Sequence, residues 1–400
     1  MAAKYWTPDY SGHFACKAGG CKMSCCSGWR IELRREEYER LRALEQNAAL
    51  AQRLQGALAL CADGARAVFV RTERGDCPLL RRDGLCALQA ECGEEALPAV
   101  CREYPRSVRA DYACEVAFSA SCEAVAELLF AAQEPLGFVQ REWPQGEPCG
   151  DGALRRTVLL RTAFMRLLQR REVSLPERMA QLAALLQRLQ ECEEAGGAAG
   201  LRRELARWSG DRKGRPYEQE PAREEEFMPR QFCAPAPDWV HLAAPLALCG
   251  AFFAGREPYG TLWEHLTRAL GLPEERADWS EEALARAAHA YAALKERFER
   301  SHPLWQAHWE RLMANYAFYA RVPVSGRLAG LREEALVFSA CYALTKFAAV
   351  CCAQEGEPSS VVARVMRLTE HSGFDRRCAE LMREGSFGAP ERLRDMLLFV

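Results

Sequence analysis

The cysteines of this chain are concentrated near its amino-terminal end. Eleven of its 19 cysteines fall within the first 122 residues, namely Cys16, Cys21, Cys25, Cys26, Cys61, Cys77, Cys86, Cys92, Cys101, Cys114 and Cys122. In a 400-residue chain whose first residues do not have the layout of a secretory signal, such a density is more typical of metal binding than of a disulfide framework. Glycine-containing turns between these cysteines indicate loops that wrap around ligands. The sequence therefore predicts a cysteine-ligated metal centre within roughly the first 125 residues.

Charge and hydropathy narrow the class of protein. With 53 Lys and Arg against 55 Asp and Glu, the formal net charge is −2, which argues against binding nucleic acid by charge alone. No apolar run reaches the ~18 residues of a spanning helix, because Pro245 and Lys346 interrupt the nearest two. We expect a cytoplasmic protein with no nucleic-acid partner and no transmembrane segment. The sequence leaves peripheral membrane contact and oligomerisation open.

The predicted fold class is mainly α, in two parts. Residues 1–130 are expected to form a cysteine-rich metal-binding module with little β structure, and residues 131–400 a C-terminal all-α helical domain. Within the module, apolar residues at helical spacing predict one inserted helix between 33 and 60. Alternating patterns near 67–71 and 112–118 predict short strands, enough for one small hairpin.

Helical periodicity dominates the second part of the chain. The predicted helices lie near 153–171, 175–193, 240–254, 280–300, 303–320, 331–353, 358–371 and 390–399. Ser174 and Glu177 have the spacing of a capping box, and Ser280 and Pro358 are further helix starts. A Pro/Gly-rich stretch near 196–237 predicts a loop.

The cysteines form two blocks with different spacings. The first runs from Cys16 to Cys26 and the second from Cys77 to Cys122, which together exceed the needs of one four-cysteine site. The Cys21-x3-Cys25 spacing is compatible with zinc, whereas the adjacent Cys25-Cys26 pair and the wide second block favour an iron–sulfur cluster. The alternative for part of the set is a small buried hydrophobic role, above all for the three cysteines Cys61, Cys92 and Cys114.

Familiar cofactor motifs are absent from the sequence. A radical-SAM enzyme would carry Cys-x3-Cys-x2-Cys, but Gly28 occupies the third position after Cys21 and Cys25. No Gly-x-Gly-x-x-Gly follows a predicted strand, so a Rossmann-type pocket cannot be located by pattern. Any small-molecule site is therefore of a less familiar kind.

The order of short motifs along nearly the whole chain resembles a known family. The motifs are Pro8-Asp-Tyr10, Phe14-Ala-Cys16, Ser24-Cys25-Cys26-Ser-Gly-Trp29, Cys77-Pro-Leu-Leu, Asp83-Gly-Leu-Cys86, Cys101-Arg-Glu-Tyr-Pro-Arg106, Ser119–Cys122, Ala314-Asn-Tyr316 and Val365–His371. This order is similar to that of the bacterial flagellin lysine N-methylases and their smaller cysteine-cluster relatives. One departure is Ala314, where the family often has an acidic residue, and it puts an acid/base role at that position in doubt.

The resemblance implies a function and a set of ligands. It implies S-adenosylmethionine (SAM)-dependent methylation of surface lysines on flagellin in the cytoplasm, with a four-iron four-sulfur cluster. The ligands it implies are drawn from Cys16, Cys21, Cys25, Cys26, Cys77, Cys86, Cys101 and Cys122. The alternative is a non-catalytic iron–sulfur or zinc-binding protein that uses its helical domain to bind a partner.

Methyl transfer to lysine requires a neutral amine, so we sought a residue that could remove a proton. The catalytic candidates are Tyr316, Glu370 and His371, although a packed aromatic residue and a helix-terminal histidine are the simpler interpretations of Tyr316 and His371. Tyr104 and Arg106 are candidates for binding a cofactor or for hydrogen bonding to the cluster. Their alternative is a rigid turn with a surface arginine. We expect the substrate cleft between the two parts of the chain.

Overall fold

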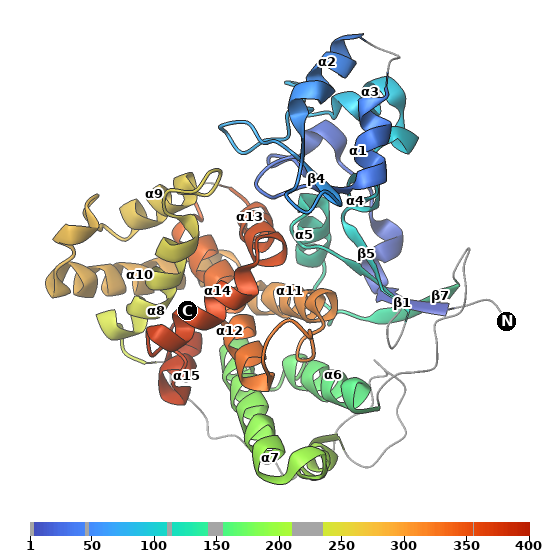
Figure 1. The fold of residues 1–400 in the computed structure, drawn as a ribbon. Coiled ribbons are helices and arrows are strands. Elements are labelled where there is room, and N and C mark those ends of the chain that lie inside the picture. The colour runs from blue at the N-terminus through green and yellow to red at the C-terminus, as the bar shows by residue number, and fades with distance from the viewer. Residues whose placement is uncertain (1–3, 45–47, 110–113, 143–154, 210–234, 355) are drawn as a thin grey trace.

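The computed structural model describes residues 4–44, 48–109, 114–142, 155–209, 235–354 and 356–400 (Figure 1). Helices make up most of this structure, and the strands are confined to the first 142 residues. The predicted mainly α class with a helical C-terminal region is confirmed.

The described part of the C-terminal region consists almost entirely of helices. Its elements are α6 (Arg155–Leu168), α7 (Leu175–Ser209), α8 (Trp239–Phe253), α9 (Gly260–Ala269), the short 3-10 turn Arg276–Asp278, α10 (Glu281–Ser301), α11 (Trp305–Ala320), α12 (Leu331–Cys351), α13 (Pro358–His371), α14 (Phe374–Glu384) and α15 (Pro390–Phe399). All eight predicted helices are present, whereas α9 and α14 were not predicted.

The predicted helix starts are confirmed by their hydrogen bonds. The Ser174 hydroxyl donates to the Glu177 carboxylate at 2.6 Å, and the Ser280 hydroxyl accepts from the Ala283 amide at 3.2 Å. The loop predicted near 196–237 is wrong in its first part, because α7 continues to Ser209. The helix is interrupted only at Gly197 (φ 56°, ψ −156°), and beyond it Leu201 and Leu205 are buried on the core side. Residues 210–234 of the predicted loop lie outside the described residues.

Helix α12 lies at the centre of the helical region. It packs against α7, α8, α13, α14 and α15, and it runs through the middle of the bundle in Figure 1. Within the described part of the chain it is the one helix long and apolar enough to cross a membrane, and its apolar window is 100% buried. A fully buried core helix passes that test equally well, so α12 carries no argument for a membrane span.

The first 142 residues contain two small sheets. A four-stranded sheet has the order β5-β6-β1-β7, with β1 parallel to β6 and antiparallel to β7. A three-stranded antiparallel sheet has the order β2-β4-β3. The strands are β1 (Lys4–Pro8), β2 (Glu32–Arg34), β3 (Leu58–Leu60), β4 (Arg66–Phe69), β5 (Arg106–Arg109), β6 (Glu115–Phe118) and β7 (Phe138–Glu142). The prediction of one small hairpin therefore underestimated the β structure.

Short helices connect these strands. They are α1 (Arg35–Arg42), α2 (Ala48–Ala57), α3 (Ala87–Cys92), α4 (Ala99–Glu103) and α5 (Glu123–Phe130), with 3-10 turns at Asp9–His13, Ala18–Gly20 and Glu94–Ala96. The single helix predicted between 33 and 60 is wrong, because this segment contains β2, α1, α2 and β3. Leu33 is buried within β2, where it pairs with Ala67 of β4, and this strand pairing overrides the local helical spacing.

Two hydrophobic cores lie beneath these elements. The smaller core gathers Trp29, Leu33, Leu79 and Leu88 under the cysteine-bearing loops. The larger core joins the four-stranded sheet and α5 to the C-terminal helices, and it includes Tyr10 and Phe118. Helix α13 packs against α5, so it stands beside the cysteine-bearing loops (Figure 1).

Candidate functional site

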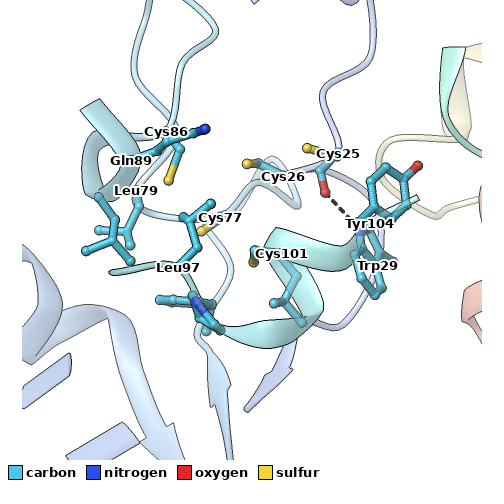
Figure 2. A pocket seen from close by; sticks show the side chains of 14 residues that line it. Cys25, Cys26, Trp29, Cys77, Leu79, Cys86, Gln89, Leu97, Cys101 and Tyr104 are labelled. Carbon is cyan, nitrogen blue, oxygen red and sulfur yellow. Dashed lines mark hydrogen bonds between the residues drawn. The ribbon is translucent and has the colours of Figure 1, made fainter. Parts of the chain in front are cut away.

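Five cysteines line one small pocket above the smaller core. The pocket has a volume of about 60 Å³, and its cysteines are Cys25, Cys26, Cys77, Cys86 and Cys101. Figure 2 shows their sulfur atoms around one space, with Trp29 and Tyr104 at one side. The remaining wall is largely apolar and includes Leu79, Leu88 and Leu97. All five cysteines belong to the ligand set predicted from the sequence, and the structure brings them together from three separate segments.

Backbone contacts hold these segments in place. The Cys77 amide donates to the Cys26 carbonyl at 2.6 Å, and the Ser27 hydroxyl donates to the Asp76 carboxylate at 2.5 Å. Gly28 has a φ of +82°, and its amide donates to the Gly75 carbonyl at 3.1 Å. A side chain would be strained at this φ, so the glycine allows the loop to turn back toward the segment that carries Cys77. Cys86 directly precedes α3, and Cys101 lies within α4.

Three of the pocket thiols, those of Cys25, Cys26 and Cys101, favour their neutral form in the absence of a bound cation. The hydrogen bond with Cys25 lowers the pKa of Cys26, but hydrogen bonding to Cys77 and burial outweigh it and raise this pKa to about 12. Hydrogen bonding to Cys26 and burial raise the pKa of Cys25 well above its usual range. Burial, followed by the neighbouring thiols, raises the pKa of Cys101 in the same way. Because only the thiolate binds a metal, a cation in the pocket would reverse these shifts.

The five pocket thiols can be compared with the ligand requirements of a single zinc ion and of an iron–sulfur cluster. A structural zinc ion draws its four ligands to about 2–2.3 Å. Among the described residues, no group of three or more His, Cys, Asp or Glu side chains is arranged to hold one metal ion. In a four-iron cluster each cysteine binds a different iron, so the sulfurs remain further apart. Four of the five pocket cysteines would suffice for such a cluster, so the donor set of the pocket is compatible with it.

The other three predicted ligands lie outside this pocket lining. Cys16 is exposed, Cys21 is half-buried and Cys122 is buried at the start of α5. Burial is the main cause that raises the pKa of Cys21 to about 12 and that of Cys122 to about 11. Next to Cys122, the Glu123 carboxylate accepts the Lys22 amide at 2.9 Å and so ties the first cysteine block to α5. A metal-binding role for these three cysteines stays a prediction.

A polar cluster forms where the end of α13 meets the turn between β6 and α5. We call it the α13 cluster, and its members are Ser119, Ser121, Glu370 and His371. The Glu370 carboxylate accepts hydrogen bonds from the Ser119 hydroxyl and, at 3.2 Å, from the Ser121 amide. The His371 Nε2 lies 3.2 Å from the Ser119 Oγ and 3.0 Å from the Ser121 Oγ. The Tyr104 hydroxyl completes the network at 2.9 Å from the Ser121 Oγ.

Trp29 joins the α13 cluster to the cysteine pocket. Its ring centroid lies 4.6 Å from that of His371 and 5.9 Å from that of Tyr104, and the Tyr104 ring is stacked on it. Its indole N–H donates to the Cys25 carbonyl at 2.7 Å, the bond drawn in Figure 2. In the structure it lines the pocket and is also part of the smaller core.

Burial perturbs the two ionisable members of the α13 cluster in opposite directions. It raises the pKa of Glu370 to about 7, although the hydrogen bonds from Ser119 and from the Ser121 and Ala120 amides act to lower it. It lowers the pKa of His371 to about 3, with the Arg367 charge acting in the same direction. The Glu370 side chain is 0% exposed, whereas that of His371 is 12% exposed. At neutral pH the imidazole is therefore uncharged, and the buried carboxyl titrates near pH 7.

Two predicted site residues do not join this network. Tyr316 is buried in α11 and stacks on Phe338, as a core aromatic residue does. Burial is the main cause that raises its pKa well above the usual range. Arg106 is exposed at the start of β5, where its guanidinium lies 5.1 Å from the Phe14 ring, and it is not among the residues that line the pocket. The roles predicted for these residues remain predictions.

Sequence reasoning did not single out several residues that organise the site. Ser119, Ser121 and Arg367 all lie within motifs that carried the resemblance, but they were given no role. Arg367 donates from α13 to the carbonyl groups of Ser24, Ser27 and Ser121. Their position within three residues of Cys122 or of Glu370 is the signal that could have drawn attention to them.

Comparison with known proteins identifies the family. The model of the FliB lysine N-methylase C-terminal domain matches residues 161–384, which is more than half of the chain. A lysine-N-methylase of Salmonella choleraesuis (strain SC-B67) is 28% identical over 102 residues, and that segment is 25% of this chain and 25% of the relative. The flagellar biosynthetic protein FliU of Salmonella muenchen is 26% identical over 102 residues, which cover 25% of this chain and 60% of that protein. Each match thus spans less than two thirds of the relative, and no solved structure matches. On the extent of the domain match, the chain belongs to the FliB lysine N-methylase family.

Proposed function

We propose that this protein is a SAM-dependent protein-lysine N-methyltransferase that acts on flagellin in the cytoplasm and requires a four-iron four-sulfur cluster. The observation that carries the proposal is the convergence of two predicted sets of residues. Five predicted ligands line one pocket, and Tyr104, Glu370 and His371 meet directly beside it. Family membership supplies the reaction, and the names of the relatives supply the amino acid that is methylated and a flagellar context.

The protein residues have to remove one proton and hold two partners in line. A lysine side chain arrives as an ammonium ion and becomes nucleophilic only after losing a proton. When bound, SAM supplies the methyl group from its sulfonium. The amine nitrogen then gains the methyl group as the bond from that group to sulfur breaks, so no oxidant or reductant is consumed.

Within the α13 cluster, His371 is the member nearest to solvent and Glu370 is the buried proton acceptor. The serine hydroxyls lie within hydrogen-bond distance of His371 Nε2 and, through Ser119, of the Glu370 carboxylate. A proton taken from the substrate at His371 passes through these hydroxyls to Glu370, whose pKa of about 7 suits a base that works near neutrality. Trp29 and Tyr104 shield this route from the cysteine pocket while keeping the two sites in contact.

The pocket cysteines would hold the iron–sulfur cluster, and Trp29 both lines this pocket and contacts His371 of the α13 cluster. The iron–sulfur cluster would stabilise the fold, because the free energy of metal binding is added to that of folding. It would also supply a fixed charge beside the reacting groups. In this proposal, Trp29 is the residue that couples a change at the metal centre to His371.

Two measurements on the full chain, purified without oxygen, test this proposal. The first is the content of iron, sulfide and zinc, for which we expect about four irons and matching sulfide per chain. The second is transfer of labelled methyl groups from SAM to purified flagellin, with the flagellin lysines acetylated in the control. Stoichiometric zinc without iron, together with no transfer, would instead support the non-catalytic metal-binding alternative.

A pair of variants connects the activity to the site. Glu370→Gln should lower the rate by about 10²–10⁴-fold, which is the usual contribution of a general base. Gln169→Ala, which removes a side-chain hydrogen bond to the Leu136 carbonyl away from the α13 cluster, is the matched control and should retain the rate. Equal rates in the two variants would exclude a role for Glu370 as the base in the reaction.

A further inference from the structure

Among the described residues, Arg367 is a buried cation that donates only to backbone oxygens. It lies on α13 and is 1% exposed. Its guanidinium donates to the carbonyl groups of Ser24, Ser27 and Ser121, the last two at 2.9 Å. Its Nε has no hydrogen-bond partner within the described residues. The side chain thus fastens α13 to the loop that carries Cys25 and Cys26 without neutralising its own charge.

Other buried arginines of this protein are neutralised. Arg178 is 2% exposed and lies 2.6 Å from the Glu310 carboxylate, and Arg161 is 3% exposed and lies 2.7 Å from Glu115. For Arg367, no carboxylate lies within 4.0 Å in the part of the chain that the structure describes. Removing a charge from water is energetically costly unless an opposite charge compensates for it. The position therefore implies a negatively charged partner that is not one of the described carboxylates.

The thiol groups of the pocket are the groups near Arg367 that can carry this negative charge. Its carbonyl contacts at Ser24 and Ser27 are the residues directly before Cys25 and directly after Cys26. Cys25 and Cys26 both line the pocket, so these hydrogen bonds fix the Arg367 guanidinium against the loop that would carry the negative charge.

We propose that Arg367 is the counter-charge of a thiolate-bound iron–sulfur cluster in the cysteine pocket. This inference rests on the metal centre of the proposed function. Four thiolates around a doubly charged four-iron core leave a net charge of −2, and each electron taken up adds another negative charge. A buried cation nearby stabilises the more negative, reduced form, so it raises the reduction potential of the cluster and slows the loss of iron. Because Arg367 lies on the same helix as Glu370 and His371, it is a positioning residue for them as well.

The experiment compares four full-length proteins purified without oxygen: wild type, Arg367→Gln, Arg367→Lys and Arg311→Gln. Arg311 is a matched control, since it is 2% exposed and donates to the carbonyl groups of Leu129 and Glu134, which do not line the cysteine pocket. The cluster is reduced stepwise with dithionite while its optical spectrum is followed, which gives the reduction potential. Iron release to an excess of chelator gives a rate for each protein. Neither measurement requires methyl transfer.

We expect Arg367→Gln to have a lower potential than wild type and to release iron several-fold faster. Arg367→Lys, which keeps the charge, should stay near the wild-type potential, and Arg311→Gln should match wild type in both measurements. Equal potentials in Arg367→Gln and wild type would overturn the inference while leaving the metal centre intact. If Arg367→Gln does not fold, Arg367→Lys provides the test. This variant keeps the positive charge, so a lowered reduction potential in it would show that the charge does not set the potential. A wild-type protein that holds neither iron nor sulfide would overturn both the inference and the metal centre.

Discussion

Asn315 joins α11 to the N-terminal part of the chain, and its substitution tests the strength of this junction. It is 0% exposed on α11, its side-chain oxygen accepts the Tyr10 hydroxyl at 2.6 Å, and its amide donates to the Phe118 carbonyl at 2.9 Å. Asn315→Ala leaves two buried polar groups without partners, and each costs about 1–3 kcal/mol. The free energy of unfolding should therefore fall by about 2–6 kcal/mol, a large fraction of the about 5–15 kcal/mol of a typical domain.

Urea unfolding of the full chain, followed by both circular dichroism and tryptophan fluorescence, measures this loss. Tyr10→Phe should cost about 1–3 kcal/mol, and the double variant should cost less than the sum of the two single variants because both remove the same bond. Tyr342→Phe is the control, since its buried hydroxyl has no hydrogen-bond partner among the described residues and its removal should not destabilise the protein. A loss below about 1 kcal/mol for Asn315→Ala, or strict additivity with Tyr10→Phe, would refute this account of the junction.

Three further predictions concern the pocket, the α13 cluster and the helical core. Cys101→Ser should lose iron and lower the melting temperature, while Cys92→Ser, which changes a cysteine outside the pocket lining, should retain both; equal iron content in the two would contradict the pocket assignment. Methyl transfer should decline as the pH falls below about 7, because Glu370 then holds its own proton, and Ser121→Ala should reduce the rate at every pH; a flat profile between pH 6 and 8 would argue against this base. Burial lowers the pKa of Lys346 to about 7, so the unfolded state binds more protons than the folded state between this pKa and the usual value near 10.4, and stability should rise with pH across that window. Lys346→Met should flatten this rise, as measured by urea midpoints at pH 7 and pH 10.

The sequence predicted the helical region well because its signals are local. Apolar residues at helical spacing and caps such as Ser280 act within a few residues, so they can be recognised without knowledge of the fold. The prediction of the strands was incomplete because their signals are not local. β1 lies between β6 and β7, more than 100 residues away along the chain, and the Trp6–Glu115 register depends on that long-range pairing. No local pattern encodes such a partner.

The candidate site shows the same contrast between local signals, which can be read from the sequence, and long-range contacts, which cannot. The cysteine-rich blocks and the family resemblance indicated the cysteines that line the pocket, because metal-binding chemistry restricts the residue type at each position. The sequence could not show which of these cysteines lie together, since Cys101 reaches the pocket through α4 whereas Cys122 directly precedes α5 outside the pocket lining. Arg367 and Ser121 could not be assigned because their contacts are to backbone carbonyls and hydroxyls, which carry no residue-type signature.

The order of the site along the chain gives its assembly a direction. The last pocket cysteine is Cys101, whereas Arg367 and His371 follow only after most of the helical region. At about 5–20 residues per second, a ribosome needs on the order of tens of seconds to travel between these points. During that interval the cysteine-bearing loops have emerged without α13 beside them, so the thiols are open to iron donors and to oxygen alike. For the proposed iron–sulfur cluster, the yield of protein that contains it should therefore depend on how quickly iron is delivered during translation. This period ends when α13 packs beside the loops.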